Sequence, residues 1–250
     1  MRSTSAKLDE RLRENLEFLG LKRIAEIFPD RAKAAVKEKA THLEFLDQLV
    51  AEEAAAKFER LVRNRMSQAR FPTIKTLDSF DFDHPKKIDR AQIKRLFTLD
   101  FIEEKANVLI LGNHGLGKTH LSLALGYEAC QRGITTRFTT AMDAINELTA
   151  AMADGSFLTV LKRYTRPRIL VLDEIGYLPV SRDGVELLFQ IISHRYETGS
   201  IVLTTNRPFK QWGKLFGNDN TLAAAVVDRL VHHAEIVVLE GDSYRMKRET

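Results

Sequence analysis

The sequence is poor in cysteine and in long apolar runs. Cys130 is the one cysteine among 250 residues, which excludes an internal disulfide framework and fits a reducing compartment. No apolar run approaches the roughly 18 residues that a membrane-spanning helix needs. The first fifteen residues contain no apolar signal core. We therefore expect a cytoplasmic protein with no membrane partner.

A large excess of either charge is also missing. The 38 basic and 34 acidic side chains give a net charge of +4, which permits nucleic-acid binding and does not by itself indicate it. Hydrophobic residues make up 44% of the chain, enough for an ordinary core. The length suits one or two domains.

Glycine is almost absent from residues 1–70, where Gly20 is the only one. Apolar residues recur there in steps of three and four, which is the helical period. We predict an N-terminal helical domain over 1–70, with Pro29 ending its second helix and a third helix starting near Thr41. A connector over 71–105 follows, with a helix from Asp89 through Phe101.

Basic residues gather at the end of the third predicted helix. Residues 57–70 contain one acid, Glu59, and five basic residues: Lys57, Arg60, Arg63, Arg65 and Arg70. Two interpretations are equally open, a solvated helix face and a contact with DNA phosphates. Lys162 and Arg163 in a later basic segment allow the same two interpretations.

The pattern changes over residues 106–250 to short apolar strands alternating with helices. Strands are predicted at 107–111, 135–139, 168–172, 200–204 and 235–239, and helices at 117–131, 140–152, 183–197 and 221–232. This alternation is typical of an α/β domain whose parallel five-stranded sheet is flanked by helices on both faces.

The first predicted strand runs into LGNHGLGKTH, residues 111–120. The spacing Gly112-x-x-x-x-Gly117-Lys118-Thr119 is that of a phosphate-binding loop. Its backbone N–H groups and the following helix N-terminus would face phosphate oxygens. Lys118 would reach the β- and γ-phosphates, and the Thr119 hydroxyl would ligate Mg²⁺. The residues expected to line the nucleotide are Gly112, Asn113, His114, Gly115, Leu116, Gly117, Lys118, Thr119 and His120.

Polar side chains follow two other strands of the predicted sheet. Asp173 and Glu174 end RILVLDE, where Asp173 would hold the metal and Glu174 would polarise an attacking water. Asn206 follows the next strand and can hold that water. A water-activating carboxylate argues against a small-molecule kinase, which activates a substrate hydroxyl instead.

Two arginines admit more than one role. Arg229, in VVDRLVHH, could stabilise charge on the γ-phosphate of a neighbouring subunit, or pair within the chain with Asp228 or another acid. Arg245, in GDSYRMKR, could act at the phosphates or simply be a tail charge.

Several motifs together resemble the IstB-like ATP-binding proteins of bacterial insertion sequences and, more distantly, the DnaC-type helicase loaders of the AAA+ superfamily. The residues that carry the resemblance are QARFPTIKTLDSFDF (68–82), GNHGLGKTHLSLALG (112–126), LVLDEIGYLPV (170–180), LLFQIISHRYETGSIVLTTNRPFKQW (187–212), VVDRLVHHAEIV (226–237) and GDSYRMK (241–247). The loop departs from the family in reading Gly-Asn-His-Gly-Leu-Gly.

The resemblance implies an AAA+ fold without a C-terminal helical lid, and an ATPase that uses ATP and Mg²⁺. It implies a homo-oligomer with nucleotide between subunits, bound to duplex DNA and working with a cognate transposase. It favours a trans-acting role for Arg229 and makes Arg245 a candidate γ-phosphate sensor. A helicase loader is the alternative, and a small-molecule kinase is the third.

Overall fold

The computed structural model describes residues 2–176, 181–216 and 219–244. The chain divides into two units, Met1–Asn64 and Arg65–Thr250. Among the described residues, every helix is too short or too polar to span a bilayer.

The first unit consists of α1 (Arg2–Phe18), α2 (Lys22–Glu38) and the first part of α3 (His42–Ala69), which continues into the second unit. Its small core contains Ile24, Phe28 and Leu49. Glu53 is also buried, because its carboxylate accepts the Ile24 backbone N–H at 3.0 Å and the Arg60 guanidinium at 3.2 Å. Since Ile24 lies in the first turn of α2, Glu53 satisfies a donor that the helix itself leaves unpaired.

The prediction that Pro29 ends the second helix is wrong, since α2 continues to Glu38. A proline inside a helix costs about 3 kcal/mol, because one backbone hydrogen bond is lost and the ring crowds the preceding turn. The segment after it, DRAKAAVKE, is composed mostly of strong helix formers. Arg31 on that segment also pairs with Glu52 on α3.

The second unit is built on a parallel sheet, as predicted. Its strands are β1 (Asn107–Gly112), β2 (Thr136–Thr140), β3 (Ile169–Ile175), β4 (Ser200–Thr205) and β5 (Ala234–Leu239). They lie in the order β2-β3-β4-β1-β5. The strand that precedes the phosphate loop, β1, is therefore separated from the strand with the two acids, β3, by β4.

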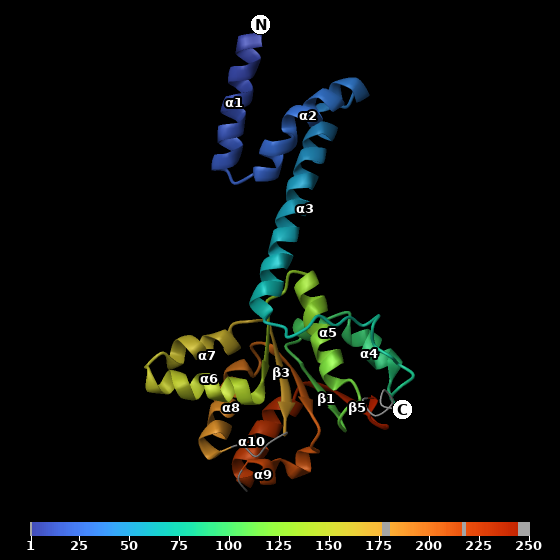
Figure 1. Cartoon of the computed structure of the whole chain (residues 1–250), viewed down its shortest axis with the longest axis vertical. Coiled ribbons are helices and arrows are strands. Elements are labelled where there is room, and N and C mark those ends of the chain that lie inside the picture. Colours follow the sequence, from blue (N-terminus) through green and yellow to red (C-terminus); the bar gives the residue numbers. More distant parts are fainter. Residues whose placement is uncertain (1, 177–180, 217–218, 245–250) are drawn as a thin grey trace. The chain divides into compact units, whose positions relative to one another are not determined.

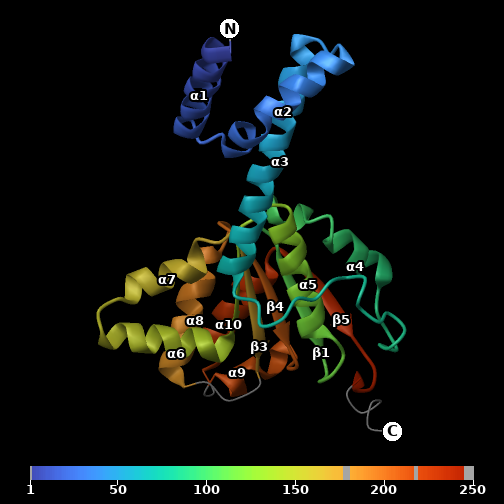
Figure 2. The same ribbon diagram turned by 45° about the horizontal axis from the view of Figure 1, so that its top comes forward.

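The remaining helices of this unit complete the predicted α/β pattern. They are α4 (Arg90–Leu96), α5 (Lys118–Gln131), α6 (Ala141–Ala153), α7 (Phe157–Thr165), α8 (Arg182–Arg195), α9 (Trp212–Leu215) and α10 (Asn220–Val231), with the 3₁₀ turns η1 (Asp100–Ile102) and η2 (Phe209–Gln211). Figure 2 shows α4 beside β5, where Gln92 donates to the Glu235 carboxylate at 2.9 Å.

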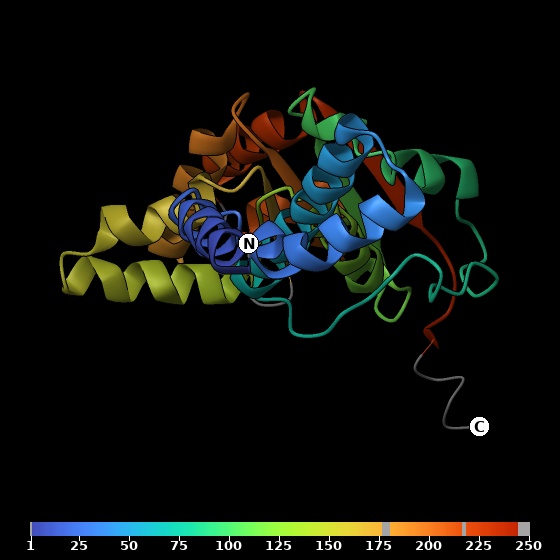
Figure 3. The same ribbon diagram turned by 90° about the horizontal axis from the view of Figure 1, so that it is seen from above.

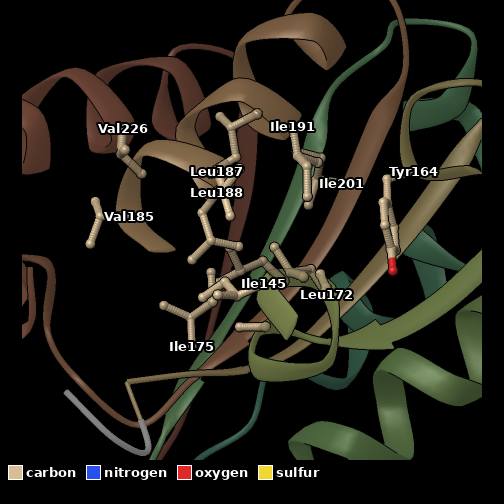
Figure 4. Close-up of a cluster of buried hydrophobic side chains, with 14 of the residues drawn as sticks. Ile145, Tyr164, Leu172, Ile175, Val185, Leu187, Leu188, Ile191, Ile201 and Val226 are labelled. Atoms are coloured by element: carbon tan, nitrogen blue, oxygen red, sulfur yellow. The ribbon is translucent and has the colours of Figure 1, made fainter. Parts of the chain in front are cut away.

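Both faces of the three central strands are buried, and β1, β3 and β4 each alternate between two cores. On β3, Leu170 and Leu172 join the core formed with α6, α7, α8 and α10, part of which Figure 4 shows. Ile169 and Val171 join the second core, formed with α5 and the connector. The sheet is thereby fixed between two layers, which holds the carboxyl ends of its strands in place.

The helix predicted from Asp89 through Phe101 is wrong in its second half. It ends at Leu96, and Leu99 takes a left-handed conformation with φ 70° before η1 begins. Arg132 accounts for the break, because its guanidinium donates to the carbonyls of Phe97 (2.8 Å) and Thr98 (2.6 Å). The side chain that follows the last residue of α5 thus replaces the next turn of helix.

Arg195, the last residue of α8, is 1% exposed and has no carboxylate partner among the described residues. Burial lowers the pKa of its guanidinium to about 10. Its partners are backbone carbonyls, namely those of Tyr164, Thr165, Pro167, Arg168 and Ser200. This side chain ties the segment before β3 to the start of β4.

We expect Arg195→Met to destabilise the second unit by at least about 3 kcal/mol, because each buried carbonyl left unpaired costs about 1–3 kcal/mol. Urea unfolding followed by the fluorescence of Trp212, the single tryptophan, measures the change. Arg168→Met is the control, because the Arg168–Glu103 ion pair is exposed and worth about 1 kcal/mol or less. Equal losses in the two variants would contradict the role of Arg195.

Candidate functional site at the carboxyl ends of the strands

The phosphate loop lies between β1 and α5, as the spacing of its glycines predicts. Lys118 opens α5, and its ammonium donates to the Asn113 carbonyl across the loop at 2.7 Å. The loop is thus closed on itself, with the helix N-terminus behind it. Backbone N–H groups and the positive end of a helix make this a site for anions.

Gly117 is required by both conformation and space. Its φ is 88°, in the left-handed region, and a Cβ built there would lie 2.6 Å from Cε2 of Phe80. Phe80 belongs to the connector and is packed in the core beneath α5. The glycine therefore lets the connector close against the loop.

Asp173 and Glu174 end β3 in different environments. Asp173 is 3% exposed, whereas the Glu174 side chain is exposed and lines a cavity. Thr119 donates its hydroxyl to Asp173 at 3.0 Å, and Thr204, at the end of β4, donates a second hydroxyl to the same carboxylate. Two neighbouring strands and the loop helix thereby converge on one carboxylate.

An irregularity in the sheet sets the direction of Glu174. The register between β3 and β4 shifts between Leu172 and Ile175, so β3 contains one extra residue there. Glu174 takes φ 61°, and its N–H donates to the Thr204 hydroxyl at 3.0 Å instead of to a strand carbonyl. Bulges of this kind redirect side chains next to active sites. Thr204 therefore positions both acids.

The residues around Asp173 fit a magnesium ion. The Asp173 carboxylate and the Thr119 hydroxyl supply the hard oxygen ligands that Mg²⁺ prefers. The carboxylate is buried, and no lysine or arginine in the described part of the chain lies within ion-pair distance of it. A buried carboxylate without a cation is costly, which a bound metal would offset.

Asn206 lies beside the loop, as predicted. Its Nδ2 donates to Nε2 of His114 at 2.7 Å, so the end of β4 is bonded to the phosphate loop. Both side chains line the cavity. His114 is part of the loop sequence in which this chain departs from the family. It adds a direct contact between the loop and Asn206.

A cavity of about 960 Å³ is lined by loop residues 114–119 and by Glu174, Thr204 and Asn206. Its size suits a nucleotide. Its second wall comes from the connector and the end of the chain, through Thr73, Lys75, Ser79, Phe80, Asp81, His84 and Tyr244. The wall is held by the edge-to-face contact of His84 with Tyr244 and by the Tyr244 N–H, which donates to the Gly115 carbonyl at 3.0 Å.

Sequence reasoning assigned no role to this wall. The segment RFPTIKTLDSFDF was singled out only for its resemblance to a family, and Thr204 was not singled out at all. The segment contains Phe71, Phe80 and Phe82, which follow neither a helical nor a strand period. These aromatic residues were the sequence feature that could have indicated a wall of the site.

His120 also lines the cavity but is bonded to the connector. Its Nε2–H donates to the Thr76 carbonyl at 2.9 Å, and its ring packs on Phe80. Burial lowers the pKa of this imidazole below its usual range. The neutral ring therefore holds the connector in place.

Arg229 is not at this site within its own chain. The carbonyl of its neighbour Leu230 accepts a hydrogen bond from Asn107, the first residue of β1. The phosphate loop follows Gly112, the last residue of the same strand. Six residues of strand, about 17 Å, separate the two ends. Arg229 makes no ion pair with any residue that the structure describes, Asp228 included. It stacks on Phe189 at 4.7 Å and donates to the Ala225 carbonyl.

The basic residues predicted to contact DNA have several different environments. Arg60 pairs with buried Glu53, and Arg63 with Glu59 at 3.8 Å. Arg65 donates to the Gly133 carbonyl at 3.0 Å. Arg70 and Arg163 both approach Glu147, while Lys57 and Lys162 are exposed. Arg245 lies outside the described residues.

Comparison with known proteins agrees with the predicted family. The family model described as IstB-like ATP binding protein matches residues 14–250. A protein of insertion sequence IS5376 from Geobacillus stearothermophilus, named for ATP binding, is 38% identical over 242 residues, covering 97% of this chain and 96% of its own. Its counterpart in IS21 of Pseudomonas aeruginosa is 40% identical, covering 86% and 81%.

Solved structures show the same fold. The DnaC helicase loader superimposes with a TM-score of 0.53 at 25% identity, covering 66% of this chain and 96% of its own. DnaA from Aquifex aeolicus, with AMPPCP bound, gives 0.56 at 24% identity, covering 69% and 51%. The predicted AAA+ fold is confirmed.

We expect Thr204→Val to lower the ATP hydrolysis that this site would support roughly 10–100-fold, the usual effect of losing a group that orients metal and catalytic ligands. Steady-state phosphate release by the folded variant is the measurement. Thr139→Val is the matched control, because Thr139 lies on β2, on the other side of β3 from β4, and among the described residues its hydroxyl donates only to the Thr140 carbonyl. Equal turnover in the two variants would show that Thr204 does not position the acids.

Proposed function

The chain belongs to the family of IstB-like ATP-binding proteins, and we propose that it is a Mg²⁺-dependent ATPase that assembles on duplex DNA. In this proposal it assists a transposase in selecting and preparing target DNA during insertion-sequence transposition. The observation that carries the enzymatic part is the pair of acids on β3, one buried beside Thr119 and one directed into the cavity. The names of the relatives support the biological setting.

Each group at the site has one task in the proposed reaction. Lys118 and the loop N–H groups bind the phosphates. Thr119 and Asp173 would hold Mg²⁺, which would offset negative charge on the phosphate oxygens. Glu174 accepts a proton from the attacking water, and Asn206 orients that water. A carboxylate directed into the cavity beside the phosphate loop favours hydrolysis over transfer to a substrate hydroxyl, which argues against a kinase.

Arg229 would act on the nucleotide of a neighbouring subunit. Its place at the amino end of β1 puts it beyond reach of its own phosphate loop, and its lack of an ion pair in the described chain leaves its charge available. An arginine supplied in trans stabilises the charge that develops on the γ-phosphate. ATP between subunits would then hold the homo-oligomer together, and hydrolysis would loosen it.

A helicase loader is the second candidate. The likeness to the DnaC loader favours it, but this likeness covers 66% of the chain. The relative from insertion sequence IS5376 covers 97% at higher identity, which favours transposition.

The absence of an internal disulfide and the burial of Cys130 fit the cytoplasm.

Mixing two inactive variants tests whether Arg229 acts in trans. Arg229→Ala and Glu174→Gln should each bind ATP and hydrolyse it poorly. In a mixed oligomer, a site with Glu174 from one variant and Arg229 from the other is complete. A 1:1 mixture should recover about a quarter of the wild-type rate, the share expected for random neighbours.

The matched control for this mixture is Arg229→Ala combined with the double variant Arg229→Ala/Glu174→Gln, in which every site lacks the arginine. If the first mixture is as inactive as this control although its subunits exchange, Arg229 does not act in trans.

Capture from cells tests the partner. With ATP bound through Glu174→Gln, the tagged protein should recover DNA and the transposase of its own insertion sequence. Lys118→Ala, which should not bind ATP, is the control for nucleotide-dependent capture. Recovery of the replicative helicase without transposase would establish the loader instead.

A further inference from the structure

Three arginines converge on a single carboxylate at the edge of the sheet. Glu147 on α6 lies 3.7 Å from Arg70, 3.8 Å from Arg137 on β2 and 3.9 Å from Arg163 on α7. Figures 1 and 3 show α6 and α7 running side by side there. With one negative charge against three positive charges, the cluster has a local excess of +2.

The carboxylate does not satisfy these guanidiniums. All three distances exceed the 2.7–3.2 Å of a good hydrogen bond. One oxygen of Glu147 already accepts the Tyr164 hydroxyl at 2.6 Å. The N–H donors of the exposed members, Arg70 and Arg163, therefore remain available to another acceptor.

Arg137 makes the cluster more than a solvated surface. It is 8% exposed, and its Nε is buried without a hydrogen-bond partner among the residues that the structure describes. Its guanidinium lies 5.8 Å from the centroid of the buried Tyr164 ring. A buried cation that is incompletely paired costs free energy, and an anion bound over the cluster would offset that cost.

The surroundings of the cluster are basic. Residues 157–168 contain Lys162, Arg163, Arg166 and Arg168 and no acid. Asp143, one turn before Glu147 on α6, is bonded to Thr140 at the start of that helix. Arg168 is paired with Glu103, so Lys162 and Arg166 remain as exposed flanking charges.

We propose that Arg70, Arg137 and Arg163 form a binding site for the phosphodiester backbone of duplex DNA. Glu147 holds the guanidiniums in place, a DNA phosphate accepts from the exposed Arg70 and Arg163, and the largely buried Arg137 adds its positive charge behind them. Guanidiniums suit this ligand because their paired N–H groups match two phosphate oxygens. This inference rests on the proposed function, and it places the DNA contact at the amino ends of the strands, away from the nucleotide.

The site also divides the basic residues at the end of α3 by role. Arg60 neutralises buried Glu53, and Arg65 is bonded to a backbone carbonyl. Both therefore have tasks within the fold. Arg70 is 60% exposed, and the one carboxylate it pairs with in the described part of the chain is shared with two other arginines. It is therefore the one of these three best placed to contact DNA.

The first test removes two exposed charges. Fluorescence anisotropy of a labelled duplex is measured against salt concentration with the full-length protein, Mg²⁺ and a non-hydrolysable ATP analogue. Arg70→Gln/Arg163→Gln should reduce the slope of log K against log salt by about 1.8 and weaken binding roughly thirtyfold at 0.15 M salt, since each phosphate contact contributes about 0.9 to the slope. The loss should be the same for duplexes of different sequence.

The matched control removes the same charge elsewhere. Arg182→Gln/Lys214→Gln alters two exposed side chains of the same unit, on α8 and α9, and should leave the slope near the wild-type value. Equal slopes for the cluster variant and the wild type would overturn the proposal and leave the proposed function standing. Absence of duplex binding by the wild type would instead overturn the function.

The second test removes the carboxylate. Glu147→Gln keeps an acceptor for Tyr164 and deletes a negative charge that repels phosphate, so duplex binding should tighten. If these ion pairs only stabilised the fold, the substitution would lower the stability of the protein without raising its affinity for duplex DNA. Unchanged or weaker binding by a folded Glu147→Gln protein, judged by its unfolding midpoint, would therefore contradict the site.

Discussion

The arrangement of the candidate site depends on two hydrogen bonds made by the Thr204 hydroxyl. This hydroxyl donates to Asp173 and accepts the N–H of Glu174, so one group fixes two adjacent acids that need opposite environments. The buried acid faces the phosphate loop helix, and the next residue, turned by the extra residue in β3, faces the cavity. The parallel sheet makes this possible because the carboxyl ends of β1, β3 and β4 meet at one edge.

The two ends of the sheet have different tasks in this account. The nucleotide site is at the carboxyl ends, whereas Arg229 and the arginine cluster around Glu147 lie toward the amino ends. Within one chain, DNA and nucleotide would therefore not touch. Their coupling would pass through the oligomer, in which the amino end of one sheet supplies Arg229 to the carboxyl end of the next. That arrangement would explain how a nucleotide controls assembly on DNA.

The sequence predicted the parts of the fold that local patterns determine. The five strands were found within one or two residues at most boundaries. The signal was strongest for β1, β3 and β4, because both faces of these strands are buried and their apolar runs are continuous. Pro29 and the segment after Leu96 were predicted wrongly, because neighbouring helix formers and a capping arginine overrode the local signal. The spacing of the loop and the two acids predicted the phosphate end of the site. Other parts of the sites could not be predicted, because they depend on contacts between distant segments that no spacing in the chain indicates. These parts are the role of Thr204, the wall formed by the connector, and the pairing of three arginines with Glu147.

The central claim is that Asp173 and the phosphate loop together bind ATP with Mg²⁺ at the carboxyl ends of the strands. Titration calorimetry with a non-hydrolysable ATP analogue tests it directly, in magnesium buffer and in EDTA, for the wild type and Asp173→Asn. The account predicts tight binding by the wild type that depends on magnesium, and loss of that dependence in the variant. Binding by the wild type that is equal with and without magnesium, or no binding at all, would contradict it.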